Sequence, residues 1–127
     1  MAITANTITM QKPPLDAVPF TVSLYSTDLS DCEELKAAVA GKSHYIRKIT
    51  IFCASAITIS IGGGETADDL TAIYLGPIPF AATSSQYIIE FPYEALVVAK
   101  ATALCIDASG AGVAAVIVEG STGPAFP

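Results

Sequence analysis

Short runs in which every second residue is apolar fill the chain from residue 44 onward, and this period of two most limits what the sequence can fold into. The clearest run holds Ile57, Ile59 and Ile61, which alternate with Thr58 and Ser60. Successive side chains of a β-strand point to opposite faces of the sheet, so such a run predicts a strand with one buried face. Similar runs carry Ile49, Ile51 and Cys53, and then Tyr87, Ile89 and Phe91.

Glycine and proline separate these runs, at residues 62–64, 76–79 and 92. Residues 108–112 (ASGAG) are typical of a hairpin connection between two further runs, 101–107 and 113–119. Many short strands with almost no helix predict an all-β fold, a jelly-roll-like antiparallel β-sandwich with at most one short helix. We expect residues 21–127 to form this single domain.

The run at 113–119 is apolar on both faces, unlike the others. In an antiparallel sandwich this pattern indicates a strand that is covered on both sides or one that is buried at a contact between subunits. We expect Ala114, Val116 and Val118 to lie at a subunit interface.

Residues 1–20 are expected to form an extended N-terminal arm. Threonine and isoleucine alternate over residues 3–10, and the prolines at 13, 14 and 19 oppose helix formation. The same residues could instead supply the first strand of the sandwich, followed by a loop. The first six residues lack a basic region followed by an apolar core, so we expect no secretory signal here.

Residues 31–40 (DCEELKAAVA) are the one plausible helix. Ser30 or Asp31 could cap its start, and Gly41 could end it. The segment is short, and an irregular strand is the alternative.

The chain is unusually apolar for its charge. Hydrophobic residues make up 52% of the 127 and charged residues only 14%, where about 25% is usual. No apolar run approaches the roughly 20 residues of a membrane-spanning helix. A monomer of this mass would expose about 6,400 Å² of surface, which so few charges would cover thinly. We therefore expect part of the surface to be buried in an obligate homo-oligomer.

Charge and cysteine content limit the partners further. The net charge is −6, and only Arg47 and Lys48 place two basic residues side by side, so we expect no direct nucleic-acid partner. Cys32, Cys53 and Cys105 stand among apolar or alternating residues and are expected to be buried thiols. One disulfide with a remaining thiol is the alternative.

No pattern in the sequence predicts an enzyme, a cofactor or a resident metal. His44 is the single histidine, and no serine stands in a Gly-x-Ser-x-Gly turn. Residues 62–69 join three glycines to three carboxylates, which could hold calcium, but their spacing fits no EF-hand loop. A mobile surface loop is the expected structure there.

Several stretches together resemble small virion proteins of tailed bacteriophages, the jelly-roll capsid decoration (cement) proteins. The resemblance is carried by residues 37–42 (AAVAGK), 45–51 (YIRKITI), 62–64 (GGG), 71–77 (TAIYLGP) and the closing 104–119 segment. It implies a homotrimer on the outer capsid surface that contacts the major capsid protein through arms or loops, after synthesis in the host cytoplasm. It implies no active-site residues. A tail or head-fibre accessory domain that binds a host receptor or a glycan is the alternative.

Two segments are the expected capsid contacts under this reading. Prolines hold both segments extended, so docking would cost little conformational entropy. The loop at 76–80 could instead merely close one end of the sandwich. The expected contact residues are Ile3, Ile8, Pro13, Pro14 and Phe20 in the arm, and Pro77, Ile78, Pro79 and Phe80 in the loop.

Overall fold

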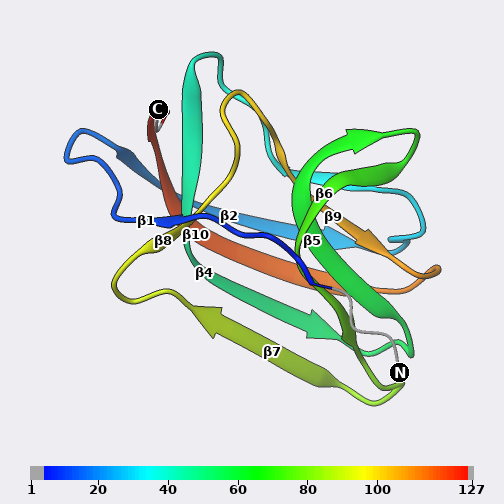
Figure 1. Cartoon of the computed structure of the whole chain (residues 1–127). Helices are drawn as coiled ribbons and strands as arrows, with labels where there is room; N and C mark the ends of the chain where they lie inside the picture. The colour runs from blue at the N-terminus through cyan, green and yellow to red at the C-terminus, as the bar shows by residue number, and fades with distance from the viewer. Residues whose placement is uncertain (1–4, 126–127) are drawn as a thin grey trace.

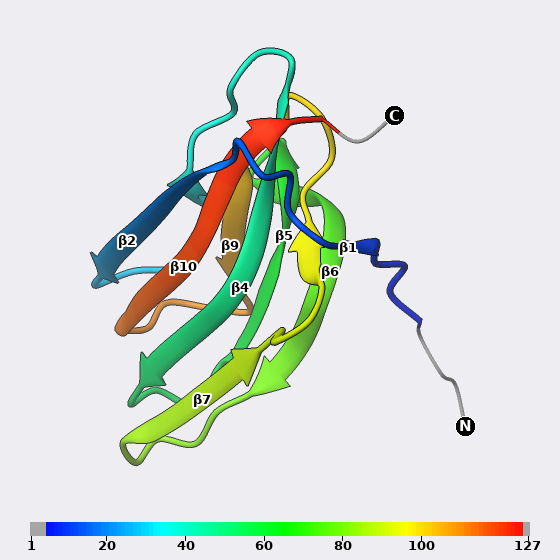
Figure 2. The ribbon, with the colours of Figure 1, turned by 90° about the vertical axis from the view of Figure 1, so that its left-hand side faces the viewer.

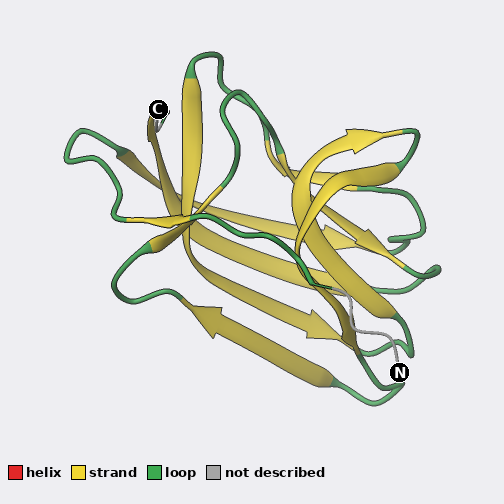
Figure 3. Cartoon of the chain, in the orientation of Figure 1, coloured by secondary structure: helices red, strands yellow, loops and turns green. Residues whose placement is uncertain are grey.

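A computed structural model describes residues 5–125, and within this range the chain is all strand and loop, without a helix (Figures 1 and 3). The strands are β1 (Met10–Gln11), β2 (Val18–Ser26), β3 (Glu33–Lys36), β4 (Lys42–Cys53), β5 (Thr58–Thr66), β6 (Asp69–Pro79), β7 (Ser85–Glu90), β8 (Ala95–Val97), β9 (Leu104–Ala108) and β10 (Ala114–Pro124).

The strands form two antiparallel sheets that pack face to face. Sheet A has the order β1-β8-β4-β10-β2, and β7 pairs with β4 next to β8, on the border away from β10. Sheet B has the order β3-β9-β5-β6. The orders β7-β4-β10-β2 and β3-β9-β5-β6 are those of a jelly roll, in which the chain passes repeatedly from one sheet to the other. The predicted fold class is therefore confirmed.

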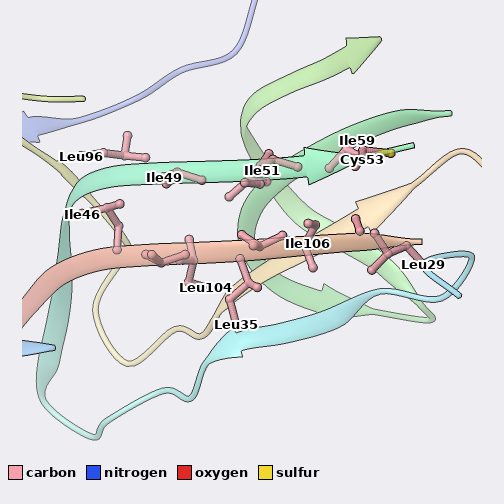
Figure 4. Close-up of a cluster of buried hydrophobic side chains, with 14 of the residues drawn as sticks. Leu29, Leu35, Ile46, Ile49, Ile51, Cys53, Ile59, Leu96, Leu104 and Ile106 are labelled. Atoms are coloured by element: carbon pink, nitrogen blue, oxygen red, sulfur yellow. The ribbon is translucent and has the colours of Figure 1, made fainter. Parts of the chain in front are cut away.

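The core lies between the two sheets and is built from the alternating apolar positions (Figure 4). Ile49 and Ile51 of β4 face Ile59 and Ile61 of β5, and all four side chains are fully buried. Burying an aliphatic side chain of this size contributes about 1.5–3 kcal/mol to stability. The inward positions of β9 and β10 complete the same cluster with Leu104, Ile106, Ala114, Val116 and Val118.

The predicted helix at 31–40 is wrong, and the irregular strand is what forms. Leu35 is buried in the core, while Glu34 before it is exposed, so the period here is two. A bulge between Glu34 and Lys36 makes the strand irregular. Cys32 and Leu35 are the buried apolar side chains of the segment, and the pairing of β3 with β9, rather than the capping residues, decided the outcome.

Two predicted connections also differ from the structure. Residues 62–64 lie inside β5, and the connection to β6 is a two-residue hairpin turn at Ala67 and Asp68, both with positive φ. Residues 108–112 do not close a hairpin, because β9 lies in sheet B and β10 in sheet A. That segment carries the chain from one sheet to the other.

Candidate interaction surface

The outer face of sheet A holds large apolar side chains that are open to solvent. Tyr25 is 68% exposed, Ile88 49% and Phe52 42%. Figure 2 shows their strands β2, β10, β4 and β7 side by side, with sheet B behind them. We call this surface the apolar face and define it by Tyr25, Phe52, Ile88, Ala115 and Ile117.

The strand register places these side chains in two neighbouring rows. Phe52 lies opposite Ala115, and Ala115 lies opposite Tyr25. In the next row Thr50 lies between Ile88 and Ile117. Tyr25 and Phe52 also line a shallow depression of about 170 Å³ at the end of the face. Contiguous exposed apolar surface of this kind marks interaction sites in proteins.

A charged row bounds the apolar face on one side. Lys48 lies between Glu90 and Glu119, and its Nζ is 3.9 Å from the Glu90 carboxylate. An exposed ion pair like this one contributes about 0.2–1 kcal/mol at most. The row therefore does little for stability, but it limits the apolar face to the part of the sheet near Phe52.

The outer side of sheet B combines acidic groups with one exposed large apolar side chain, Ile73, which is 38% exposed. Asp69 and Asp107 line a depression of about 330 Å³ there. Partial burial raises the pKa of Asp107, and the charges of Asp69, Asp31 and Asp68 raise it further, against a hydrogen bond from the Ala108 N–H. Among residues 5–125 no three acidic, histidine or cysteine side chains are placed to hold a metal ion.

The buried polar groups serve the fold. The His44 ring bridges Thr122 Oγ1 and the Ala37 oxygen, each at 2.7 Å, and meets the Phe20 ring edge-on at 5.8 Å. Burial lowers the pKa of His44, so the neutral ring is favoured. The Tyr45 hydroxyl donates to the Pro124 oxygen at 2.6 Å.

The three cysteines are free and buried, as predicted. Burial, together with the neighbouring Cys105, raises the pKa of Cys32 to about 12. Burial also raises the pKa of Cys105. Thiols of this kind hold little thiolate near neutral pH and are poor nucleophiles.

The arm residues that were predicted to contact the capsid differ in how far they are exposed. Ile8 is 39% exposed, and Pro13 and Pro14 are half-buried. Phe20 is not in the arm, because β2 begins at Val18; its ring packs against the core beneath the Lys36 ammonium. Ile3 lies outside the described residues.

The predicted loop at 76–80 is mostly the end of β6. Pro77 and Pro79 are exposed, but Ile78 and Phe80 pack against the core. The period of two continues through this segment and turns Ile78 and Phe80 inward, which leaves both side chains half-buried. The capsid contacts of this segment stay a prediction. The same alternation turns Phe20 inward, where it too is half-buried.

The structure brings the arm and the β6 segment together. Asn6 Nδ2 donates a hydrogen bond to the Gly76 oxygen at 2.7 Å. Thr7 and Thr9 line a depression of about 370 Å³ with Tyr74 of β6. Two segments predicted separately as contacts therefore form one rim, which we define by Asn6, Ile8, Pro77 and Pro79 and call the arm rim.

The predicted subunit interface on β10 needs a correction. Ala114, Val116 and Val118 are 2%, 1% and 0% exposed, because they face the core. Side chains so deeply buried cannot contact a second subunit. The alternate residues Ala115 and Ile117 occupy the outer face, and the doubly apolar pattern of this strand was the signal for them.

Comparisons with known proteins assign no family to the chain. No family model matches it, and no curated protein matches its sequence. Among solved structures, a chain from the Bacillus endospore appendages, a family of disulfide-linked pili, is 11% identical with a TM-score of 0.37. The match covers 95% of this chain and 96% of that one, a likeness too slight to carry an argument. Over the described residues, no helix is long and apolar enough to cross a membrane.

Proposed function

We propose that this chain is a non-enzymatic structural protein of a virion, a decoration (cement) protein that binds the major capsid protein as a homo-oligomer. The observation that carries the proposal is the contrast between the two sheets. Sheet A exposes the apolar face, whereas the depression on sheet B sets exposed Asp69 and half-buried Asp107 beside one exposed large apolar side chain, Ile73. Such a molecule has one side suited to burial against protein and one suited to water.

The free energy of binding to a capsid would come mainly from burying the apolar face of sheet A. Burying apolar surface is worth about 25 cal/mol per Å², less the cost of ordering the two partners. Ordering would cost little at the apolar face, because Phe52, Ala115 and Ile117 stand on strands paired on both sides. Three copies around a threefold axis, the number that the resemblance implies, would add avidity to each single contact.

The arm rim is the second candidate for contact with the capsid. Ile8, Pro77 and Pro79 are exposed there, and the proline rings restrict the backbone before binding. A rim that spans both sheets could reach one capsid subunit while the apolar face lies against another copy or a neighbouring subunit. Bridging of that kind is what stabilises a capsid lattice.

The direct test is co-sedimentation of the purified chain with undecorated phage capsids. We expect saturable binding and a higher temperature of capsid disruption. Phe52→Glu, which puts a charge on the apolar face, should lower occupancy at least tenfold. Tyr93→Glu is the matched control, because Tyr93 is 88% exposed in a loop outside both surfaces.

Equal loss of binding in both variants would speak against the apolar face as the contact. Absence of binding by the unaltered chain, with measurable affinity for host glycans instead, would contradict the decoration proposal and favour a receptor-binding accessory domain.

A further inference from the structure

The two borders of sheet A are finished in different ways. On one border β1 pairs with β8, and the Val97 N–H donates to the Thr9 oxygen at 2.8 Å, so the arm covers the edge. On the other border β2, nine residues long, pairs with β10 alone in the described part of the chain. Figure 2 shows β2 at that open border.

The β2 border is also free of charge. Its sequence, VPFTVSLYS, contains no lysine, arginine, aspartate or glutamate. The other border strands carry Glu33, Glu34 and Lys36 in β3, Asp69 in β6 and Glu90 in β7. Edge strands are normally protected from association by charged side chains or by cover. β2 carries no charged side chain of its own; near its start it contains Pro19, and the Lys36 ammonium of β3 lies over the Phe20 ring.

The position of Pro19 indicates which backbone groups point outward. A proline lacks the N–H and is tolerated in an edge strand where that position faces away from the sheet. Backbone groups alternate in direction along an antiparallel strand. Thr21, Ser23 and Tyr25 therefore present their N–H and C=O groups to the open border.

The inward side chains of β2 are only partly covered. Phe20, Val22 and Leu24 pack against the core but stay half-buried. The corresponding inward residues of β10, such as Val116 and Val118, are fully buried between two neighbouring strands. A further strand beside β2 would bury the remaining apolar surface of all three residues.

We propose that the open border of β2 binds β2 of a second copy of this chain, antiparallel, about a twofold axis at Ser23. In this register the two Ser23 residues pair with each other, and Thr21 pairs with Tyr25 of the second copy. The hydrogen bonds then come from the outward groups named above, and Pro19 lies beyond the paired stretch. Centring on Thr21 would instead place Pro19 in a hydrogen-bonded position.

The net charge favours this border over the others. Each copy carries −6, so two copies repel each other, and a border without carboxylates adds the least repulsion at close range. β2 provides such a border, and the joined sheets place two copies of the apolar face next to each other. The inference does not depend on the capsid, and it adds a twofold contact to the proposed function rather than replacing the contact made by the apolar face.

Cross-linking tests the register. Paired residues of a hydrogen-bonded antiparallel site have Cα atoms about 5.5 Å apart, within disulfide range. With oxidised glutathione, the two thiols of Ser23→Cys would exchange to one disulfide and release two reduced glutathiones. We expect a covalent dimer at twice 13.1 kDa on a non-reducing gel. Gln86→Cys, in the exposed β7 border strand, is the matched control.

A charge variant tests the contact without a covalent bond. Ser23→Lys would set two ammonium groups against each other, so its self-association constant should fall at least tenfold. Tyr93→Lys, in the loop outside both surfaces, should leave that constant unchanged. Circular dichroism would check that each variant is folded. Equal cross-linking at both cysteine positions, or unchanged association of folded Ser23→Lys, would overturn the proposal even if capsid binding were intact.

Discussion

Asn6 in the arm donates a hydrogen bond to the backbone oxygen of Gly76 in β6, at 2.7 Å and across 70 positions of sequence. Nearby, Met10 pairs with Leu96 at the border of sheet A. The arm is thus attached to both sheets at one side of the sandwich. This attachment, the apolar face and the open β2 border are the three features on which the proposed assembly depends.

The arm attachment should respond to loss of the Asn6 amide. Asn6→Ala removes one exposed hydrogen bond, worth about 0.5–1.5 kcal/mol. We expect faster hydrogen exchange at the Val97 amide, which donates to Thr9, and little change in the global free energy of unfolding. Exchange at Val97 that matched the unaltered chain would show that Asn6 does not hold the arm.

Gly62 should tolerate no side chain. A Cβ there would lie 1.8 Å from the Ala72 oxygen, in the irregular pairing of β5 with β6. We expect Gly62→Ala to lower the free energy of unfolding by at least about 3 kcal/mol, measured by urea unfolding. Gly110→Ala is the control, since nothing lies within 4 Å of its Cβ, and it should stay within about 0.5 kcal/mol.

His44 should make the fold sensitive to mild acid. Burial, with a smaller effect from Lys36, lowers the pKa of His44 below 6.5, while its hydrogen bond to Ala37 acts in the other direction. The folded chain therefore binds this proton less tightly than the unfolded chain. The His44 contribution to stability is complete above pH 6.5 and is lost as the pH falls toward the lower pKa of the folded state.

The measurement is the slope of the free energy of unfolding against pH between 7.5 and 5, which should be shallower in His44→Gln than in the unaltered chain. The slope is informative even where the substitution lowers stability at every pH. Parallel curves for the two proteins would contradict this assignment.

Asp107 should change the stability of the fold with pH in the opposite direction to His44. Partial burial and neighbouring carboxylates raise its pKa, so its contribution to stability is complete below its unfolded pKa of 3.8 and is lost as the pH rises through the folded pKa. We expect Asp107→Asn to unfold at higher urea than the unaltered chain at pH 7, with a smaller difference at pH 3. Glu94→Gln, in an exposed loop, removes the same charge and is the control. An equal gain in resistance to urea there would show that general repulsion among the negative charges, rather than the site of Asp107, is responsible.

Much of the fold was predictable because the buried strands keep a strict period. Ile57, Ile59 and Ile61 are buried between less buried polar residues, as their alternation predicts. The jelly-roll class followed from the number and spacing of such runs. The pairing partners did not, because β4 and β10 are joined by contacts far apart in sequence.

The errors arose where local signals competed with packing. Asp31 and Gly41 offered the ends of a helix, yet the segment paired with β9 as a strand and placed Leu35 in the core. On β10 the sequence showed two apolar faces but could not say which one the second sheet would cover. The burial of Val116, rather than Ile117, depends on that long-range packing.

The apolar face could have been recognised in part. Phe52 stands between Ile51 and Cys53, so it must point away from whatever buries them. Tyr25 and Ile88 likewise stand between inward-facing residues of their own strands, so each must point outward. Their gathering into neighbouring rows depends on the order β7-β4-β10-β2, which no single strand contains.

The most direct test of the account is the mass of the unaltered chain in solution, by light scattering behind size exclusion across a range of concentrations. The account predicts a species of at least twice 13.1 kDa. If the threefold contact forms alone, the species should have three times 13.1 kDa. A single species of 13.1 kDa at every concentration would contradict the claim that this chain is built to assemble.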